Sequence, residues 1–336
     1  MSISLLLLAI GGTLAMTLFG ILGGLAFAGI DRVLAARMQS RIGPPLRQPF
    51  IDMLKLMLKQ NIVPANAIPW LFNGAPLVAL ASAITILLYI PMSSFQCLPV
   101  LGLHGDLVLI MYLLLLPALA MVVGGLSSGS PYATLGAQRE MVTMIAYELP
   151  LAVTIITFAW KLVQTGAAAP FSLATLAATP IWTLVGPLGF VGLLLLLGCM
   201  LLVAPGELGR IPFDAPEAET EIAGGLLVEY SGRNLALFTL SLAVKTIVVT
   251  SLIVALFFPW NLSQWVTISG GPLIAGAADF AFYLFKIFVI LFFAVTLIRI
   301  SVARFRINQI VDIYWKVVGA ASIFGLILVM VDAHIL

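Results

Sequence analysis

The chain has 336 residues, of which 62% are hydrophobic and only 9% charged, and its formal net charge is +2. A composition this apolar indicates a membrane protein with several spanning helices, and so small a net charge argues against a nucleic-acid-binding protein. The two cysteines and two histidines show no metal-ligand spacing. We therefore expect no metal or haem site built by this chain alone.

Eight apolar stretches reach the length of about 20 residues that a helix needs to span a bilayer. The predicted spanning helices are residues 3–29, 70–95, 106–126, 140–164, 183–205, 233–258, 272–298 and 317–336. The sequence thus predicts an all-α polytopic membrane protein with about eight transmembrane helices in a single transmembrane domain, residues 1–336. The first stretch has no basic segment before it, so we interpret it as a retained helix and not as a cleaved signal peptide.

The first loop contains a further helical pattern. Over residues 46–60 apolar side chains recur at helical spacing and are interrupted by charged ones such as Asp52 and Lys55. The segment is too short and too charged to span a membrane. It predicts an amphipathic helix that lies along the cytoplasmic surface or closes the mouth of a cavity.

Basic residues are distributed unevenly among the loops. Thirteen of the 16 lysines and arginines lie in the first, third, fifth and seventh loops, and the second and sixth loops hold none. Because loops rich in lysine and arginine stay in the cytoplasm, this pattern predicts that both termini lie outside. The other three are Lys161, Lys245 and Lys286, of which the last two fall near the middle of predicted helices. Such lysines either pair with a buried acid or belong to a proton path.

Two glutamates mark the fourth predicted helix. Glu140 stands at its start, where either the helix dipole or a function explains an acid. Glu148 lies about 12 Å further along the helix, inside the membrane, where burying a carboxylate is costly. We expect Glu148 to be protonated part of the time, or paired with Lys245 or Lys286. Tyr147 shares a helix face with Glu140 and joins the predicted path.

The most acidic part of the chain is the loop 206–232, which we call the acidic loop. From Glu207 to Glu229 it holds six acids and one base, Arg210. Interleaved prolines and apolar residues indicate that the loop is packed and not freely solvated. Crowding and burial raise carboxyl pKa values, so some of these acids should carry protons near neutral pH.

Two segments carry a family resemblance. Arg37-Met-Gln-Ser-Arg41-Ile-Gly43-Pro44, followed by Gln48-Pro49-Phe50, resembles the first loop of the membrane-arm subunit at the foot of respiratory complex I, the NADH dehydrogenase subunit 1 type. Pro212-Phe-Asp-Ala-Pro-Glu-Ala-Glu-Thr-Glu221 with Glu229-Tyr-Ser-Gly232 resembles the acidic fifth loop of that subunit. The resemblance extends over nearly the whole chain.

Other features favour one branch of this superfamily. The connection from Gly43-Pro44 to Gln48-Pro49-Phe50 is short, and Ser130-Pro131-Tyr132 with Arg139-Glu140 is similar to the corresponding subunit of group 4 energy-converting [NiFe] hydrogenases. This branch includes formate hydrogenlyase and the carbon monoxide-induced enzymes. The resemblance implies an anchor and proton-channel subunit of a prokaryotic cytoplasmic membrane. It would couple electron transfer from ferredoxin or formate to protons, which forms H2, to proton or sodium translocation.

The resemblance also implies that this chain has no catalytic centre and binds no cofactor. The [NiFe] centre and iron–sulfur clusters would belong to a hydrogenase large subunit and an iron–sulfur small subunit. Further expected partners are antiporter-like membrane subunits, a ferredoxin or formate dehydrogenase module, and the lipid bilayer. The residues expected in proton coupling are Glu140, Tyr147, Glu148, Asp214, Glu217, Glu219, Glu221, Glu229, Lys245 and Lys286. Those expected to dock the hydrophilic module are Arg37, Arg41, Arg47, Arg139 and Arg210.

Three alternatives stay open at this point. The first is a true complex I subunit with a quinone chamber. The second is a stand-alone secondary ion transporter that uses Glu148, Lys245 and Lys286. The third is a relative that reduces sulfane sulfur instead of protons.

Overall fold

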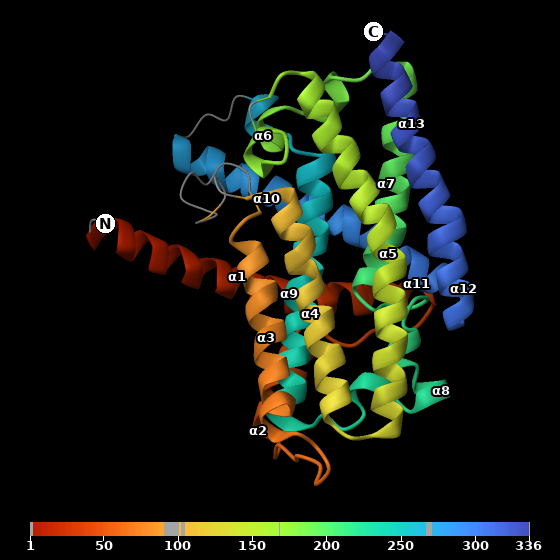
Figure 1. Ribbon diagram of the computed structural model, residues 1–336. Coiled ribbons are helices and arrows are strands. Elements are labelled where there is room, and N and C mark those ends of the chain that lie inside the picture. Colours follow the sequence, from red (N-terminus) through yellow and green to blue (C-terminus); the bar gives the residue numbers. More distant parts are fainter. Residues whose placement is uncertain (1–2, 91–100, 102–104, 168, 267–270, 336) are drawn as a thin grey trace.

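The computed structural model describes residues 3–90, 101, 105–167, 169–266 and 271–335 (Figure 1). Over these residues the chain is helical and contains no β-strand, and eight helical segments are long and apolar enough to cross a membrane. The predicted class, an all-α polytopic membrane protein, is therefore confirmed. The predicted end of the second helix, residue 95, lies outside the described residues.

The helices have the following bounds. They are α1 (Ile3–Met38), α2 (Gln48–Leu58), α3 (Pro69–Leu87), α4 (Leu107–Ser127), α5 (Pro131–Gln164), α6 (Leu173–Ala178), α7 (Pro187–Glu207), α8 (Glu219–Ile222), α9 (Gly232–Phe257), α10 (Pro272–Leu291), α11 (Ile298–Ser301), α12 (Ile307–Asp312) and α13 (Ala320–Ile335). Two π-helical segments, Phe292–Leu297 and Ile313–Gly319, join α10 to α11 and α12 to α13. Each π-helical segment thus lies inside one long spanning helix.

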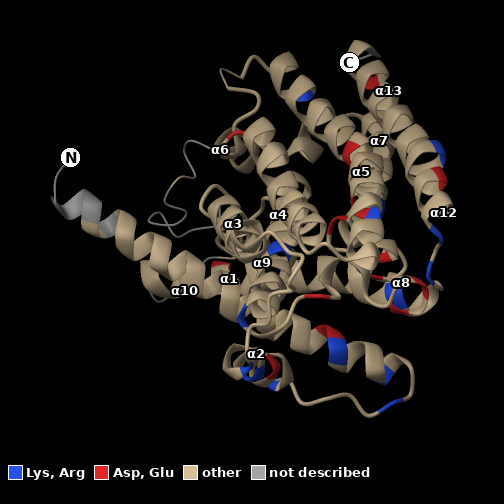
Figure 2. Cartoon of the chain, turned by 60° about the horizontal axis from the view of Figure 1, so that its bottom comes forward, with Lys and Arg blue, Asp and Glu red and all other residues tan. Residues whose placement is uncertain are grey.

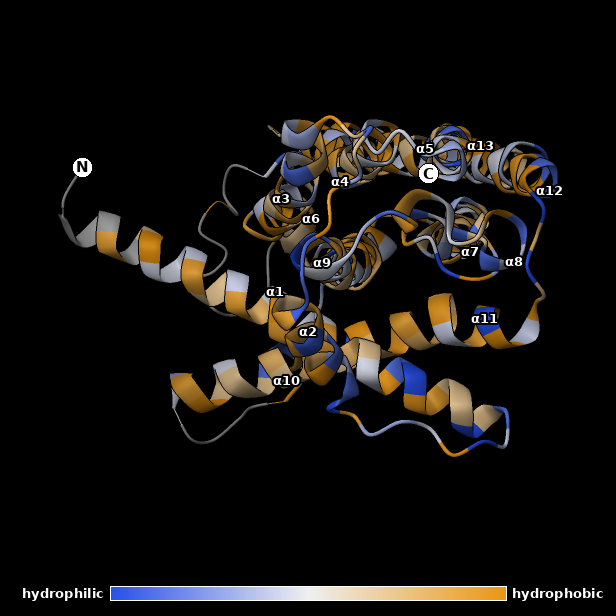
Figure 3. Cartoon of the chain, turned by 90° about the horizontal axis from the view of Figure 1, so that it is seen from below, coloured by the Kyte–Doolittle hydropathy of each residue, from blue (hydrophilic) through white to orange (hydrophobic). Residues whose placement is uncertain are grey.

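Helix α9 forms the centre of the molecule. Its most apolar stretch is 94% buried, whereas the corresponding stretches of the other spanning helices are 33% to 56% buried. Helices α3, α4, α5, α7 and α13 run roughly parallel to it, and α1 crosses them at a steep angle (Figure 1). The view in Figure 3 shows α1, α10 and α11 together on one side of α9. A polar residue on α9 is therefore surrounded by protein rather than by lipid.

Helix α1 continues beyond its predicted end at residue 29. Two charged residues, Asp31 and Arg32, end the apolar pattern, but both have partners in the fold. Arg299 Nη1 lies 2.9 Å from Asp31 Oδ2, and Arg32 Nη1 lies 3.0 Å from Asp52 Oδ2. Because these charges are paired, the helix tolerates them and reaches Met38.

Helix α5 begins earlier than the predicted residue 140. Pro131 occupies its first position. The N–H of a residue at this position has no partner within the helix, so proline, which lacks an N–H, is tolerated there. Glu140 consequently lies more than two turns inside α5, and the helix dipole acts only within the first turn. The helix-dipole explanation for Glu140 is therefore wrong, which leaves its tertiary contacts to account for it.

The last spanning helix also begins earlier, at Ile307 instead of residue 317, since the π-helical segment continues the helix through Lys316. The predicted amphipathic helix is present as α2, which buries Pro49 and Met53 and exposes Leu54 and Leu58. Figure 2 shows that charged residues gather towards the end of the molecule that carries α2 and α8.

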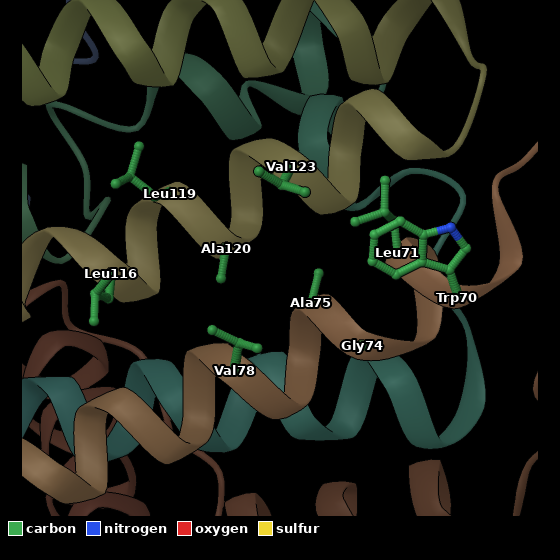
Figure 4. Close-up of a pocket in the computed structure, with 9 residues that line it drawn as sticks. All are labelled: Trp70, Leu71, Gly74, Ala75, Val78, Leu116, Leu119, Ala120 and Val123. Carbon is green, nitrogen blue, oxygen red and sulfur yellow. The ribbon is translucent and has the colours of Figure 1, made fainter.

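A hollow between α3 and α4 is lined almost entirely by apolar groups (Figure 4). Its volume is about 270 Å³. The residues that line it are Trp70, Leu71, Gly74, Ala75, Val78, Leu116, Leu119, Ala120 and Val123. Since none of these side chains titrates, this hollow takes no part in the candidate site below.

Candidate functional site

Charged side chains from four parts of the chain meet in one enclosed cavity. Glu140 comes from α5, Glu207 from the end of α7, Lys245 from the middle of α9, and Asp214 and Glu217 from the acidic loop. The volume of the cavity is about 10 Å³. This is close to the volume that a single buried water molecule needs. We call this arrangement the charged cavity. Four of its five charged residues were predicted from sequence.

An ion pair lies at the core of the charged cavity. Lys245 Nζ is 2.7 Å from Glu207 Oε1, and each side chain is only 3% exposed. The distance is that of an ion pair, although the contact does not have the geometry of a hydrogen bond. Two charges removed from water in this way need each other, because removal of either leaves an uncompensated buried charge. The sequence identified Lys245 but missed Glu207 as a site residue.

The end of α7 directs Glu207 inwards. Gly209 adopts a left-handed conformation with φ +56°. The amide of Arg210 donates to Pro205 O at 2.8 Å, and that of Gly209 donates to Gly206 O at 3.1 Å. These bonds form the Schellman motif that ends many helices and reverses the chain. The acidic loop therefore folds back over the residue with which α7 ends.

Two arginines hold the acidic loop in place. Arg304 binds Asp214 with two hydrogen bonds, from Nε to Oδ1 at 2.8 Å and from Nη2 to Oδ2 at 2.6 Å. Arg139 Nη1 donates to Glu221 Oε2 at 2.6 Å and to Ala215 O at 3.2 Å. Paired arginine–carboxylate contacts of this kind fix orientation as well as charge. The loop is thus packed and anchored, as its interleaved apolar residues indicate.

Glu217 connects the charged cavity to the surface. It lines the cavity and also an outer cleft of about 500 Å³, which Glu219 lines as well. Burial raises the pKa of Glu217 to about 7, with Arg210 opposing the shift and Asp214 adding to it. Protein surrounds the carboxyl while part of the residue stays accessible through the cleft. Glu217 is therefore poised to change its protonation near neutral pH.

This pKa gives a testable pH dependence. Below about pH 7 Glu217 is mostly protonated, and above it mostly charged. If Glu217 accepts the first proton, coupled turnover of the parent complex should rise between about pH 6 and about pH 8. Glu217→Gln should remove that rise, measured as turnover across this range. A parent and a variant with the same pH profile would show that Glu217 is not the group that titrates.

Tyr147 and Glu148 lie next to the charged cavity without lining it. Tyr147 is 1% exposed, and its hydroxyl faces Glu207. Its ring packs edge-on against Tyr314, with 6.2 Å between centroids. Glu148 is half-buried, and the predicted pairing with a lysine is not found, because Lys245 is bound to Glu207 instead.

Lys286 lies away from the charged cavity. Its Nζ donates to Phe258 O at 2.9 Å and to Trp260 O at 2.8 Å, and it lies 5.2 Å from the centre of the Phe282 ring. The ammonium thus binds carbonyls just beyond the end of α9, where a positive charge is favourable. The structure does not bring Lys286 together with the other predicted path residues.

The remaining predicted residues divide into two groups. Glu219 and Glu221 are exposed, and Glu229 is half-buried in the turn before α9 without lining the charged cavity. Among the arginines predicted to dock a partner, Arg139 binds the acidic loop and the half-buried Arg210 lies near Asp31 and Glu217. These contacts lie within the chain, and the docking role of both arginines stays a prediction. Arg37, Arg41 and Arg47 are exposed.

The carboxylates of the charged cavity do not form a metal site. Among the described residues, no three side chains of histidine, cysteine, aspartate or glutamate stand together as a metal site would require. Titratable side chains held together in this way are able to bind and release protons.

Comparison with known proteins gives consistent relatives. The profile of the NADH dehydrogenase family matches residues 12–330. A subunit of the NADH-quinone oxidoreductase of Bacillus cereus (strain B4264) is 32% identical over 328 residues, which cover 93% of this chain and 91% of that protein. The same subunit of Bacillus thuringiensis (strain Al Hakam) shows the same identity and coverage.

A solved structure is also similar. One chain of the membrane-bound sulfane sulfur reductase, an archaeal respiratory membrane complex, superposes with a TM-score of 0.81 at 29% sequence identity. The match covers 96% of this chain and 99% of that chain. Similarity over the whole length thus links the fold to subunits of respiratory membrane complexes.

Proposed function

Because this chain belongs to the NADH dehydrogenase family and is a membrane subunit of a complex I-like respiratory complex, we propose that it couples electron transfer to ion translocation. The observation that carries this proposal is the charged cavity, in which Glu140, Glu207, Glu217 and Lys245 meet inside the bundle. Titratable groups buried together are costly for a fold and are typical of functional sites. Their place between the acidic loop and α9 suits a path from a redox partner into the membrane.

The proposed mechanism begins at Glu217, which lines both the charged cavity and the outer cleft. Electron transfer in a docked hydrophilic module changes the local charge, and a carboxyl with a pKa of about 7 answers by binding or releasing a proton. That change alters the electrostatic field at the Lys245–Glu207 ion pair. The pair is almost fully buried, with 2.7 Å between Lys245 Nζ and Glu207 Oε1. Glu140 and Glu148 would pass the change sideways to antiporter-like subunits. Coupling then means that each site changes the proton affinity of the next.

The docking face is proposed to be the end that carries α2 and α8. Charged residues gather there (Figure 2), and Arg47 stands exposed immediately before α2. An exposed guanidinium can bind a carboxylate of a partner through two parallel hydrogen bonds. The outer cleft beside Glu217 opens where the acidic loop meets the surface, so a module docked there would face the start of the path.

We further propose that the redox module is a [NiFe] hydrogenase. This proposal rests on the sequence similarity of three segments to that branch: the short connection after Pro44, Ser130–Tyr132, and Arg139-Glu140. In this branch the metal centres belong to partner subunits. The names of the relatives favour two other acceptors, quinone and sulfane sulfur. The three assignments share the coupling role and differ in the electron acceptor.

One purification tests the branch. A tag on this chain should recover the intact complex, whose subunits are identified by mass spectrometry and whose nickel is measured directly. We expect nickel and H2 evolution from reduced methyl viologen. A complex without nickel that reduces quinone or sulfane sulfur would contradict the hydrogenase assignment and leave the coupling proposal standing.

Glu148→Gln tests whether the path continues along α5. The amide keeps the shape of the side chain and removes its titrating proton. Ion translocation by the complex should fall by about a hundredfold, the lower end of what a positioned proton carrier typically contributes, while electron transfer from an artificial donor survives in part. Translocation equal to that of the parent at every pH tested would place Glu148 off the path.

Membrane orientation has its own test. The basic loops predict that Ser40 faces the cytoplasm and that Thr179, in the fourth loop, faces outside. Both residues are exposed. In a cysteine-free background, Ser40→Cys and Thr179→Cys should react with an impermeant thiol reagent from opposite sides. Reaction of both from the same side would contradict the predicted orientation.

A further inference from the structure

Tyr314, from the last spanning helix, reaches into the end of α7. Its side chain is fully buried, and its hydroxyl donates to Leu202 O at 2.9 Å. The same hydroxyl contacts the backbone of Gly206 and lies near Glu207, the acid of the buried ion pair. A side chain from another helix thus binds the last turn of α7, immediately before Glu207.

The last turn of α7 is weak by itself. Pro205 has no N–H, so it cannot donate to the carbonyl of Leu201 as an α-helical residue would. Gly206 has no side chain, and glycine loses more conformational entropy than any other residue when it is fixed in a helix. The position of Glu207 therefore depends on contacts from outside α7.

Gly206 is also the residue that admits Tyr314. A Cβ at position 206 would collide with the hydroxyl of Tyr314 and would stand 2.9 Å from its ring carbon Cζ. A residue with a side chain would therefore push the tyrosine away from Leu202 O. Pro205 and Gly206 thus leave the turn both weak and open to a side chain from another helix.

A π-helical segment presents Tyr314 to α7. The last spanning helix runs beside α7 (Figure 1), and Tyr314 is the second residue of its segment Ile313–Gly319. Hydrogen bonds in such a segment join residues five apart, and segments of this kind are frequent at functional sites. The segment contacts α7 a second time, where Cys199 Sγ donates to Val318 O at 3.6 Å. Two contacts therefore fasten it to α7, and one of them lies next to the ion pair.

The ring of Tyr314 joins α7 to two other parts of the site. Its centroid lies 4.9 Å from that of Phe213 in the acidic loop and 6.2 Å from that of Tyr147 in α5. Aromatic pairs at such distances attract one another. Ring packing therefore places Tyr314, and its hydroxyl fixes the end of α7.

We propose that Tyr314 is a positioning residue of the charged cavity, whose hydroxyl fixes the last turn of α7 so that Glu207 stands against Lys245. The inference rests on the proposed function, because it gives the ion pair a part in coupling. Only 2.7 Å separate Lys245 Nζ from Glu207 Oε1, so a small shift of the turn would break the contact. The last spanning helix would thereby control the geometry of the pair.

The test compares Tyr314→Phe with the parent in the intact complex, reconstituted in proteoliposomes. The variant keeps the ring and removes the hydroxyl. Loss of one hydrogen bond of ordinary strength changes an equilibrium by about fivefold. We therefore expect the number of ions translocated per electron to fall by about two- to fivefold, while electron transfer from an artificial donor continues.

The matched control is Tyr283→Phe. Tyr283 is also buried, and its hydroxyl donates to Ser251 Oγ at 2.6 Å between α10 and α9. The control loses a buried hydroxyl as Tyr314→Phe does, but at a place that does not hold the end of α7. It should keep the ratio of ions to electrons of the parent.

Gly206→Ala tests the same contact from the other side. The added Cβ should displace the hydroxyl and lower the ratio of ions to electrons even though Tyr314 is retained. Gly198→Ala, on the same helix, should behave like the parent, because a Cβ there meets no atom of the described residues within 4 Å. Replacement of Tyr314 by 4-aminophenylalanine keeps a donor for Leu202 O without a phenol, and it should restore the ratio.

Infrared spectroscopy of the complex gives a readout that is independent of translocation. The carboxylate band of Glu207 is identified by its absence from Glu207→Gln/Lys245→Met. This band should shift in Tyr314→Phe and stay unchanged in Tyr283→Phe. A tyrosine that only stabilised the fold would leave the band where it is in the parent.

Two results would overturn the proposal. The first is a Tyr314→Phe variant with the ratio and the Glu207 band of the parent, while Glu207→Gln/Lys245→Met has lost translocation. That outcome would remove the positioning role and leave the coupling role of the ion pair standing. The second is failure of 4-aminophenylalanine to restore the ratio, which would show that the phenol carries the proton itself. Parent-like translocation by Glu207→Gln/Lys245→Met would instead overturn the proposed function, and with it the part of Tyr314 in coupling.

Discussion

Lys245→Met should destabilise the protein by about 3–5 kcal/mol, the usual cost of removing one partner from a buried ion pair. The variant leaves the Glu207 carboxylate without its ammonium, and both side chains are only 3% exposed in the parent. The free energy of unfolding, or the melting temperature of the purified complex where unfolding is irreversible, measures the effect. Ion translocation should be lost as well.

A double variant separates stability from function at this pair. Glu207→Gln/Lys245→Met removes both charges, and neutral replacements of a buried ion pair are often tolerated. Stability should therefore largely recover while ion translocation stays lost. The control is Arg32→Met, which breaks the exposed pair with Asp52 and should cost at most about 1 kcal/mol. Recovery of translocation together with stability would show that the pair is only structural.

Glu140→Gln should give the other large effect. Glu140 lines the charged cavity with the Lys245–Glu207 pair, and the amide keeps its shape without a titrating proton. Translocation should fall by roughly a hundredfold, since a positioned proton carrier typically contributes that much or more. Electron transfer from an artificial donor should continue, because this chain is proposed to hold no redox centre. Ion flux and electron flux are measured together in vesicles.

The matched control for Glu140 is Glu219→Gln. Glu219 is an exposed carboxylate of the acidic loop and lines the outer cleft only. Its replacement should leave translocation within about twofold of the parent, as expected for an exposed surface group. If both variants lose translocation equally, the loss results from the reduced negative charge of the whole region and not from the position of Glu140 in the charged cavity.

The number and class of the spanning helices followed from the sequence because their signal is local. Hydropathy over about 20 residues identifies a spanning helix without knowledge of its neighbours. Helix ends were less predictable, since they depend on partners elsewhere in the chain. Asp31 interrupts the apolar pattern of α1, and its contacts with Arg299 and Thr296 explain why the helix continues.

Glu207 shows why the site was only partly predictable. In the sequence it is one acid at the edge of an acidic loop, close to the predicted end of a helix. Its role depends on the end of α7 lying against the middle of α9, where Lys245 stands. A buried lysine requires an acid, so the sequence could signal that a partner exists, but not which of the acids it is.

Lys286 shows a second limit of the sequence. Its position inside an apolar stretch predicted a charge that either pairs with a buried acid or belongs to a proton path. The long side chain instead reaches the carbonyls of Phe258 and Trp260 beyond the end of the preceding helix. Which groups a lysine reaches depends on how two helices are joined, and helical periodicity carries no information about that connection.

The number of ions translocated per electron shows whether the charged cavity couples the two fluxes. The purified complex is reconstituted in proteoliposomes, and ion uptake and electron transfer are recorded in the same sample for the parent and for Glu207→Gln/Lys245→Met. We expect the ratio of the variant to fall close to zero while electron transfer from an artificial donor continues. An unchanged ratio in a stable, assembled variant would contradict this coupling role.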